Sequence, residues 1–400
     1  MRCFLVFLLL TSLAAAQTKR TVTDAEVAEI TKSALLIDTH NDVTSRTVEG
    51  LDIGKPATDT HTDLPRLKQG GVGAVIFAAY VSSAYAKDNS SAHRALDMID
   101  TVRQNIVAEH PNDFVFATTA AEIEAAKKNG KIAALIGIEG GHAIEDSPRL
   151  IRDFYALGVR YMTLTHTNTN SWADSSGDVN DTTVKHHNGL TPLGKQIIAE
   201  MNRVGMMVDV SHVADKTFWD ALEFSKAPII ASHSSCRAIA NVPRNMTDEM
   251  ITALGRKGGV IQINFNCGFL SQASADAAKK GPGMAALLDM RKRYKDDPAK
   301  LKEETARMTA EMKKNEVPAT LADVVAHIDR AVKLAGIDGV GIGSDFDGVS
   351  CTPRGLEDVS KFPNLTRALL EKGYTAAQIK KIYGGNTLRL MRAVEKARGI

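Results

Sequence analysis

The residues with the clearest chemical potential are histidines and carboxylic acids that follow short apolar segments of the chain. His40 and Asp42 are two positions apart, so on an extended strand their side chains point the same way and can bind one metal ion. His212 and His233 follow two later segments and can supply nitrogen ligands. Glu139 follows a segment between these groups, and its two oxygens can bridge two ions. The sequence therefore predicts a metal centre.

The predicted ligands are nitrogen and oxygen atoms, without a thiolate. Such a set is typical of zinc (Zn²⁺), with manganese (Mn²⁺) or cobalt (Co²⁺) as substitutes. A single histidine at the end of a strand is more often an ordinary polar group, and a His-x-Asp pair alone is common. The prediction depends on the recurrence of such residues after five segments. Two metal ions that share a water molecule lower its pKa far enough to leave hydroxide near neutral pH.

Eight short apolar segments predict buried parallel strands, and segments with apolar residues at intervals of three to four positions predict helices between them. This alternation favours an α/β fold, and eight strands favour a closed (β/α)8 TIM-like barrel. Together with the predicted metal ligands, we expect a barrel of the metal-dependent hydrolase type. An open doubly wound sheet is less favoured, because no glycine-rich phosphate loop follows the first strand. The predicted strands are 34–38, 73–80, 132–138, 160–165, 206–210, 228–232, 259–265 and 339–343, and the helices 92–109, 148–157, 192–204, 216–224, 248–257, 321–335 and 364–371.

Residues 271–318 depart from this alternation and are rich in Lys, Glu, Arg, Met and Ala. We predict that they form a charged helical insertion between strands seven and eight of the barrel. A solvated decoration is the favoured interpretation, because charge runs usually face water. A lid or a dimer contact over the barrel mouth is the alternative. The rest of residues 17–400 is predicted to be a single barrel domain.

The N-terminus has the features of a cleavable secretory signal, predicted for residues 1–16: an early arginine, a short apolar run and small residues before Gln17. The mature protein is therefore expected to be secreted or periplasmic, without a transmembrane anchor. A formal net charge of +2 gives no reason to expect nucleic acid as a partner. Outside the predicted signal, the cysteines are Cys236, Cys267 and Cys351, so at most one disulfide can form within the mature chain.

A set of motifs, in order along the chain, resembles the membrane (renal) dipeptidase family, peptidase family M19. The resemblance covers almost all of the predicted mature chain. It implies a dipeptidase with two zinc ions per chain that hydrolyses small dipeptides, including those with a C-terminal D-residue, by a metal-bridging hydroxide. The motifs are IDTHND (37–42), GIEGGH (137–142), YMTLTH (161–166), NSWADSS (170–176), VDVSHV (208–213), SHSS (232–235), NVPRN (241–245) and IGSDFDGV (342–349).

The resemblance also implies a role for each site residue. One zinc ion would be bound by His40 and Asp42, the other by His212 and His233, with Glu139 between them. His166 would contact the substrate and the developing oxyanion. Arg244 would pair with the terminal carboxylate of the substrate. Asp345 would be the acid–base group and would also meet the free amine. The implied catalytic residues are therefore Asp345, His166 and Glu139, and the substrate-binding residues are His166, Arg244 and Asp345.

Two other functions remain open. One is a different barrel metallohydrolase, acting on a lactone, phosphoester or cyclic amide. Many of those begin with His-x-His and use a bridging lysine, whereas no lysine ends a predicted strand here. The other is a periplasmic binding protein that has lost catalysis, which the complete ligand set disfavours. Asn266 stands where we expect an aromatic residue in several relatives, so the preferred dipeptide stays open. A homodimer, which relatives often form, is also open.

Overall fold

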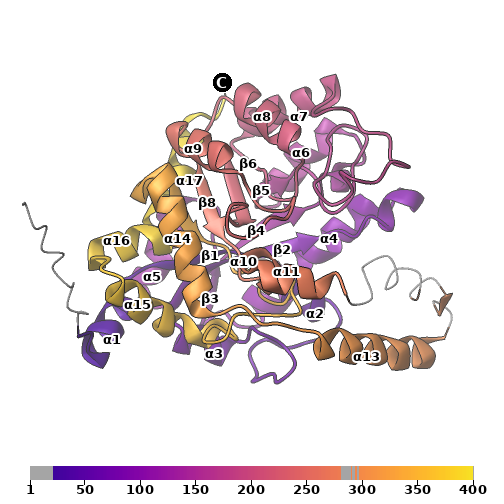
Figure 1. The fold of residues 1–400 in the computed structure, drawn as a ribbon. Helices are drawn as coiled ribbons and strands as arrows, with labels where there is room; N and C mark the ends of the chain where they lie inside the picture. Colours follow the sequence, from indigo (N-terminus) through magenta and orange to yellow (C-terminus); the bar gives the residue numbers. More distant parts are fainter. Residues whose placement is uncertain (1–20, 281–289, 291–292, 295–296, 400) are drawn as a thin grey trace, which may run out of the picture.

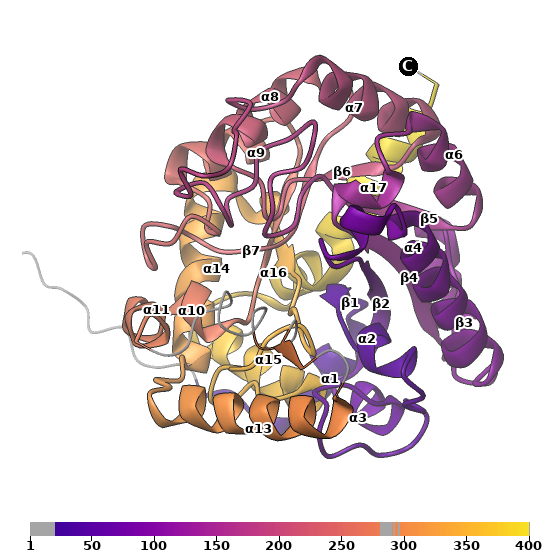
Figure 2. The ribbon, with the colours of Figure 1, turned by 90° about the vertical axis from the view of Figure 1, so that its right-hand side faces the viewer.

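The structure is a computed structural model that describes residues 21–280, 290, 293–294 and 297–399. The predicted signal segment 1–16 lies outside these residues. Eight parallel strands run side by side and form a nearly closed barrel surrounded by helices (Figures 1 and 2), as the sequence predicts. They are β1 (Leu36–Asn41), β2 (Val72–Tyr80), β4 (Ile132–Glu139), β5 (Val159–Thr163), β6 (Met207–Asp209), β7 (Ile230–Ser234), β8 (Val260–Ile263) and β9 (Val340–Ile342).

The first and last strands of the barrel meet just beyond β9. Asn41 pairs with Phe346 in a parallel bridge. The amide of Asp345 donates to the carbonyl of His40 at 3.0 Å, and the amide of Asp42 donates to the carbonyl of Phe346 at 2.9 Å. These bonds join the rim at the point where two of the predicted site segments leave the sheet.

The strands are apolar because both of their faces are buried. Every residue of β1 and β4 is buried. Alternate strand residues, including Ile37, Leu135 and Tyr161, pack in one cluster with buried residues of α5 (Ala120–Lys128) and α17 (Asn386–Lys396). The larger cluster joins the other strand faces to the surrounding helices.

The seven predicted helices are all present; those at 192–204 and 321–335 have the predicted bounds, and the other five have shifted ends. The first is α-helical only to Thr101 and continues as a π-helical turn over Val102–Ala108. Among the described residues outside the insertion, the structure adds five helices of five or more residues that the pattern misses, together with the short strand β3 (Phe114–Phe116), which pairs with β4. The predicted helices are α4 (Ser91–Thr101), α6 (Pro148–Ala156), α7 (Pro192–Val204), α8 (Asp215–Phe224), α9 (Asp248–Arg256), α14 (Leu321–Ala335) and α15 (Phe362–Glu371); the added ones are α1 (Asp24–Ser33), α3 (Leu64–Gln69), α5 and α16 (Ala376–Lys380), with α17 after them and the short α2 (Thr44–Thr47).

The charged insertion follows β8. It begins after α10 (Cys267–Leu270) and contains α11 (Gln272–Ala278) and α13 (Pro298–Lys314). Helix α13 lies at the edge of the molecule in both views (Figures 1 and 2), and most of its described side chains are exposed. This exposure agrees with the solvated interpretation of the insertion. Among the described residues, every helix is too short or too polar to cross a lipid bilayer.

A disulfide joins Cys267 and Cys351, and Cys236 is free and buried. The prediction of at most one bridge in the mature chain is therefore confirmed. The bridge connects the segment after β8 with the segment after β9, on either side of the insertion and α14.

Gly137 in β4 leaves the space that the ring of Tyr161 occupies, because an added Cβ would lie 2.0 Å from that ring. We expect Gly137→Ala to displace Tyr161 and to lower the free energy of unfolding by about 1–3 kcal/mol. Gly385→Ala is the matched control, since its nearest neighbouring atom would be 3.4 Å away. Thermal unfolding of the two variants measures the difference, and equal melting temperatures would contradict the expectation.

Candidate metal centre and active site

The rim at the C-terminal ends of the barrel strands brings the predicted ligands together. In this fold, that rim is where catalytic groups lie. All five side chains are buried, with His40 and His233 fully so. Three of the strands end later than predicted, because β1 includes His40, β4 includes Glu139 and β7 includes His233. The other two ligands follow strands: Asp42 comes directly after β1, and His212 lies three residues after β6.

The carboxylate of Glu139 lies between two groups of histidines. Its Oε1 is 2.9 Å from Nε2 of His212 and 3.3 Å from Nε2 of His233. Its Oε2 is 3.6 Å from Nε2 of His40, on the other side. Each oxygen therefore faces a different set of nitrogen atoms, which is the arrangement that a bridging ligand requires.

Asp42 and Asp345 complete the group around His40. Nε2 of His40 is 3.3 Å from Oδ2 of Asp42, and the ligand atoms of these three residues all lie within 4.8 Å of one another. The amide of Asn264 donates to Oδ2 of Asp345 at 2.7 Å. The structure thus places Asp345 beside His40 and Asp42, on the Oε2 side of Glu139.

Burial and neighbouring charges shift the pKa values in opposite directions. Burial lowers the pKa of His212 and His233 well below the usual value, so both rings are neutral with a lone pair to give. Burial opposes ionisation of Glu139, yet the histidines around it, His40 first, hold its pKa well below its usual range. Burial, with Asp42 adjacent, raises the pKa of Asp345 to about 8.

The donor atoms fit a metal ion better than they fit one another. Nε2 of His212 and Nε2 of His233 lie 3.0 Å apart and both face Glu139 Oε1. Nε2 of His40 is buried and forms no hydrogen bond within the described part of the chain. Buried polar atoms normally have partners, and neutral imidazole with carboxylate oxygen is a ligand set that zinc accepts. The residues are therefore suited to hold divalent cations on both sides of Glu139.

The outer nitrogen of two ligand histidines is held by a hydroxyl group. Nδ1 of His40 is 2.7 Å from the Tyr161 hydroxyl, which donates to the carbonyl of Thr39 at 3.1 Å. Nδ1 of His233 is 2.8 Å from Oγ of Ser232, which donates to Asp209 at 2.6 Å. A hydroxyl that has given its proton elsewhere accepts from Nδ1–H, so Nε2 keeps its lone pair for a metal.

Two of the loop residues at the rim have left-handed backbone. His212 has φ of 68° and Asp345 has φ of 63°. Non-glycine residues rarely adopt this conformation, and each such residue costs on the order of 1 kcal/mol or more. Hydrogen bonds from the Asp345 amide to the His40 carbonyl and from the Ser176 amide to the His212 carbonyl hold the two residues in this strained conformation at the rim.

His166 and Arg244, the predicted substrate-binding residues, lie at the outer side of the centre. The His166 side chain is 18% exposed, twice the value for His212, and its Nε2 is 3.8 Å from Glu139 Oε1. The Arg244 guanidinium donates to the carbonyl of His233 at 3.1 Å and lies over the ring of Phe269. Its hydrogen-bond partners are uncharged, and among the described residues Arg244 forms no ion pair with a carboxylate.

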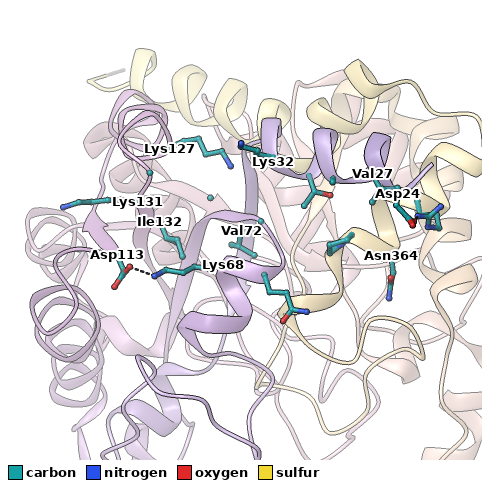
Figure 3. A pocket seen from close by; sticks show the side chains of 18 residues that line it. Asp24, Val27, Lys32, Lys68, Val72, Asp113, Lys127, Lys131, Ile132 and Asn364 are labelled. Carbon is teal, nitrogen blue, oxygen red and sulfur yellow. Dashed lines mark hydrogen bonds and ion pairs between the residues drawn. The ribbon is translucent and has the colours of Figure 1, made fainter. Parts of the chain in front are cut away.

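A cavity of about 870 Å³ lies at the opposite end of the barrel (Figure 3), beside the first residues of β2 and β4. It contains none of the predicted site residues. Lys32, Lys68 and Lys127 line it from the last turns of α1, α3 and α5, where positive charge offsets the helix dipoles. Lys68 is also paired with Asp113 at 2.5 Å. We therefore assign this end of the barrel to stability rather than to chemistry.

The sequence analysis missed the residues that support the ligands. Tyr161 lies at the start of a motif that was noticed only for its histidine, and it reaches His40 across 121 positions. Asn264 also contacts the site from a distant strand. One signal was available: Ser232 precedes His233 just as Ser211 precedes His212, and the two serine hydroxyls lie 3.4 Å apart.

The fold and the ligand set define a (β/α)8 barrel with a candidate metal centre at its C-terminal rim. The chain belongs to the membrane dipeptidase family, peptidase family M19, whose sequence profile matches residues 24–399. It is 34% identical over 386 residues to an uncharacterized dipeptidase of Schizosaccharomyces pombe, covering 92% of this chain and 82% of that protein. It is 36% identical over 377 residues to the dipeptidase verJ of Clonostachys rogersoniana, covering 90% and 84%.

Solved structures show the same fold. The probable dipeptidase PvdM from Pseudomonas aeruginosa superposes with a TM-score of 0.78 at 26% identity, covering 93% of this chain and 98% of that one. A metallopeptidase from Rhodobacter sphaeroides, solved with a phosphinate mimic of the dipeptide L-Ala-D-Ala, superposes with a TM-score of 0.73 at 24% identity, covering 90% and 99%. The predicted family and barrel are thereby confirmed.

Ser232→Ala removes the hydroxyl that joins His233 to Asp209. Because such partners orient a ligand and fix its tautomer, we expect metal affinity to fall about 10–100-fold. Ser235→Ala is a matched control from the same segment, since its buried hydroxyl has no hydrogen-bond partner in the described structure. Competition with a chromophoric chelator measures both affinities. Equal dissociation constants for the two variants would remove Ser232 from this role.

Proposed function

We propose that this protein is a zinc-dependent dipeptidase with two zinc ions per chain, acting on small dipeptides that include those with a C-terminal D-residue. The observation that carries the proposal is the position of Glu139, whose two oxygens face separate groups of buried histidines. Membership of the membrane dipeptidase family supports the reaction. The D-residue preference is drawn from the family resemblance.

His40, Asp42 and Oε2 of Glu139 would hold one ion, and His212, His233 and Oε1 of Glu139 the other. When bound, two such ions supply a water molecule of lowered pKa as the nucleophile and polarise the substrate carbonyl. The chain itself must bind and orient the dipeptide, exclude bulk water and deliver a proton to the leaving amine. The burial of the ligand residues supports the exclusion of water.

Arg244 is the residue best suited to the substrate carboxylate. Its side chain is partly buried, its guanidinium lacks a carboxylate partner in the described residues, and its planar donors fit a carboxylate with two parallel hydrogen bonds. It also lines a cavity of about 340 Å³ together with Phe269. An arginine at one end and Asp345 at the other would measure the length of the substrate, which favours dipeptides over longer chains.

Asp345 would meet the free amine and move the proton. Burial and Asp42 raise the pKa of Asp345 to about 8, so its carboxyl can carry a proton near neutral pH. Asn264 holds Oδ2, which leaves Oδ1 on the side of Asp42. His166, more exposed than His212, would donate to the developing oxyanion from the outer side of the centre.

We also propose that the mature chain, residues 17–400, acts after secretion to the periplasm or the medium. The support is the sequence of residues 1–16, which has the order of charge, apolar run and small residues of a signal peptide. A homodimer remains a proposal from the family resemblance. Gel filtration with light scattering distinguishes one copy from two.

The first test of function is metal content with dipeptide hydrolysis. The Rhodobacter sphaeroides metallopeptidase of this fold was solved with a mimic of L-Ala-D-Ala, so this dipeptide is the first substrate to try. We expect about two zinc ions per chain by elemental analysis, loss of hydrolysis on chelation and recovery with zinc. Glu139→Gln should lower both zinc content and turnover, because a neutral amide bridges two cations poorly.

Two outcomes of that test would contradict parts of the proposal. Two zinc ions without hydrolysis of any dipeptide would keep the metal centre and move the substrate to another amide or ester. Near-normal activity of Glu139→Gln would remove Glu139 from the centre. A protein that binds no metal and gains no activity on adding zinc, manganese or cobalt would be a binding protein that has lost catalysis.

Arg244→Ala should raise KM for dipeptides and lower kcat/KM by about 2–4 kcal/mol, because the substrate carboxylate loses a charge-assisted pair. A dipeptide amide lacks that carboxylate, so the variant should hydrolyse the acid and the amide with similar kcat/KM. Arg237→Ala is the control from the same loop, since Arg237 is paired with Asp215 at 2.6 Å. An unchanged preference for the acid in Arg244→Ala would assign Arg244 a structural role.

A further inference from the structure

The disulfide Cys267–Cys351 joins the two loops that hold Asp345. Cys267 lies three residues after Asn264, whose side chain donates to Oδ2 of Asp345. Cys351 lies six residues after Asp345 itself. The two loops are also joined by backbone hydrogen bonds. The amide of Phe265 donates to the carbonyl of Ser344 at 3.0 Å, and the amide of Cys267 donates to the carbonyl of Cys351 at 3.2 Å.

The segment between Asp345 and Cys351 folds back onto the carboxylates of the centre. Gly348 donates its amide to the carbonyl of Asp345 at 3.1 Å. A Cβ added to Gly348 would lie 2.3 Å from Oδ2 of Asp42 and 2.4 Å from Oδ1 of Asp345. The backbone of Gly348 is therefore packed directly against both carboxylates, and only two residues separate it from Cys351.

The bridge does not close the barrel. The strands are already joined by their ladders and by the hydrogen bonds between β1 and the segment after β9. A chain of this size buries enough apolar surface to fold without disulfides. The two cysteines are 84 positions apart, and the segment between them contains the insertion and α14. Apart from the backbone hydrogen bonds given above, the disulfide is therefore the direct link that fixes these two loops to each other. The mature chain is also predicted to reach an oxidising compartment, where such a bridge persists.

We propose that the Cys267–Cys351 disulfide is a positioning element of the centre, because it holds the 346–351 segment against the carboxylates of Asp42 and Asp345. This inference rests on the proposed function for its effect on turnover, but its effect on metal binding can be measured without any substrate. Opening the bridge lets Gly348 withdraw, so the two carboxylates lose their fixed positions beside His40. Reduction should therefore weaken the side of the centre formed by His40 and Asp42 while the barrel stays folded.

The experiment uses the full mature protein and the variant Cys267→Ser/Cys351→Ser. Tris(carboxyethyl)phosphine is the reductant: the disulfide gains two electrons and two protons to become two thiols, and the phosphine takes oxygen from water to become its oxide. Zinc dissociation constants are measured by competition with a chromophoric chelator, kcat and KM with L-Ala-D-Ala, and folding by circular dichroism. Cys236→Ser is the control for exchange of a cysteine, because Cys236 is free and buried away from Asp345.

We expect the double variant and the reduced wild type to bind the zinc ion on the side of His40 and Asp42 about 10–100-fold less tightly. The change in kcat should exceed the change in KM, and the circular dichroism spectrum at 25 °C should be unchanged. The reductant should have no further effect on the double variant, which separates reduction from removal of zinc by the phosphine. Cys236→Ser should keep the zinc affinity of the wild type. If the double variant does not fold, reduction of the folded wild type gives the same comparison.

Three results would overturn the proposal. A lower melting temperature with unchanged zinc affinity and kcat at 25 °C would make the bridge a stability element only. Peptide mapping that finds Cys267 and Cys351 as free thiols in active protein would remove the bridge altogether. Equal zinc loss in the double variant and in Cys236→Ser would assign the effect to cysteine exchange. A protein without dipeptidase activity but with disulfide-dependent zinc affinity would refute the proposed function and keep this inference.

Discussion

The position of one carboxylate, that of Glu139, is the constraint on which the site depends. A buried carboxylate is stable only when its charge is compensated. The rings of His212 and His233 are neutral, so cations held between Glu139 and the histidines that face its two oxygens would supply that compensation. The pKa of Glu139 is held well below its usual range even though burial opposes this. Glu139 therefore remains an anion, with its two oxygens directed to opposite sides of the candidate metal centre.

A second layer of carboxylates fixes the strands that carry the histidines. Asp209 accepts from both the amide and the hydroxyl of Ser232 on the neighbouring strand, at 2.8 and 2.6 Å. Asp38 accepts in the same way from the amide and hydroxyl of Ser344, at 2.8 and 2.6 Å. Each of these buried pairs joins two barrel strands just below a ligand. The two halves of the centre thus have the same kind of support, although they come from distant parts of the chain.

The sequence predicts the barrel and its rim because both follow from local patterns. Parallel strands of one barrel end on one rim, so polar residues after each strand, such as His40 and His233, must lie near one another. The strand β3 (Phe114–Phe116) is too short to show a strand pattern. Many residues of α1 and α5 are small or charged, which obscures the apolar spacing of a helix. The α-helix predicted over 92–109 ends earlier than expected, because the π-helical turn Val102–Ala108 continues the apolar spacing of α4.

The contacts that refine the site are those that no local pattern carries. Tyr161 reaches His40, and Asn264 reaches Asp345, across 121 and 81 positions. The pairing of Cys267 with Cys351 is likewise fixed by the fold, since three cysteines allow three pairings.

The two ends of the barrel divide stability from chemistry. At the end where the strands begin, lysines in the last turns of helices offset the helix dipoles. At the other end, His212 and Asp345 take left-handed backbone and several buried polar atoms lack partners in the described structure. Departures from local rules that cluster at one place are expected of a functional site, because a structure retains them only where binding repays the cost. These features of the rim lower the stability of the fold on their own. Cations bound between the histidines and carboxylates would offset that loss of stability.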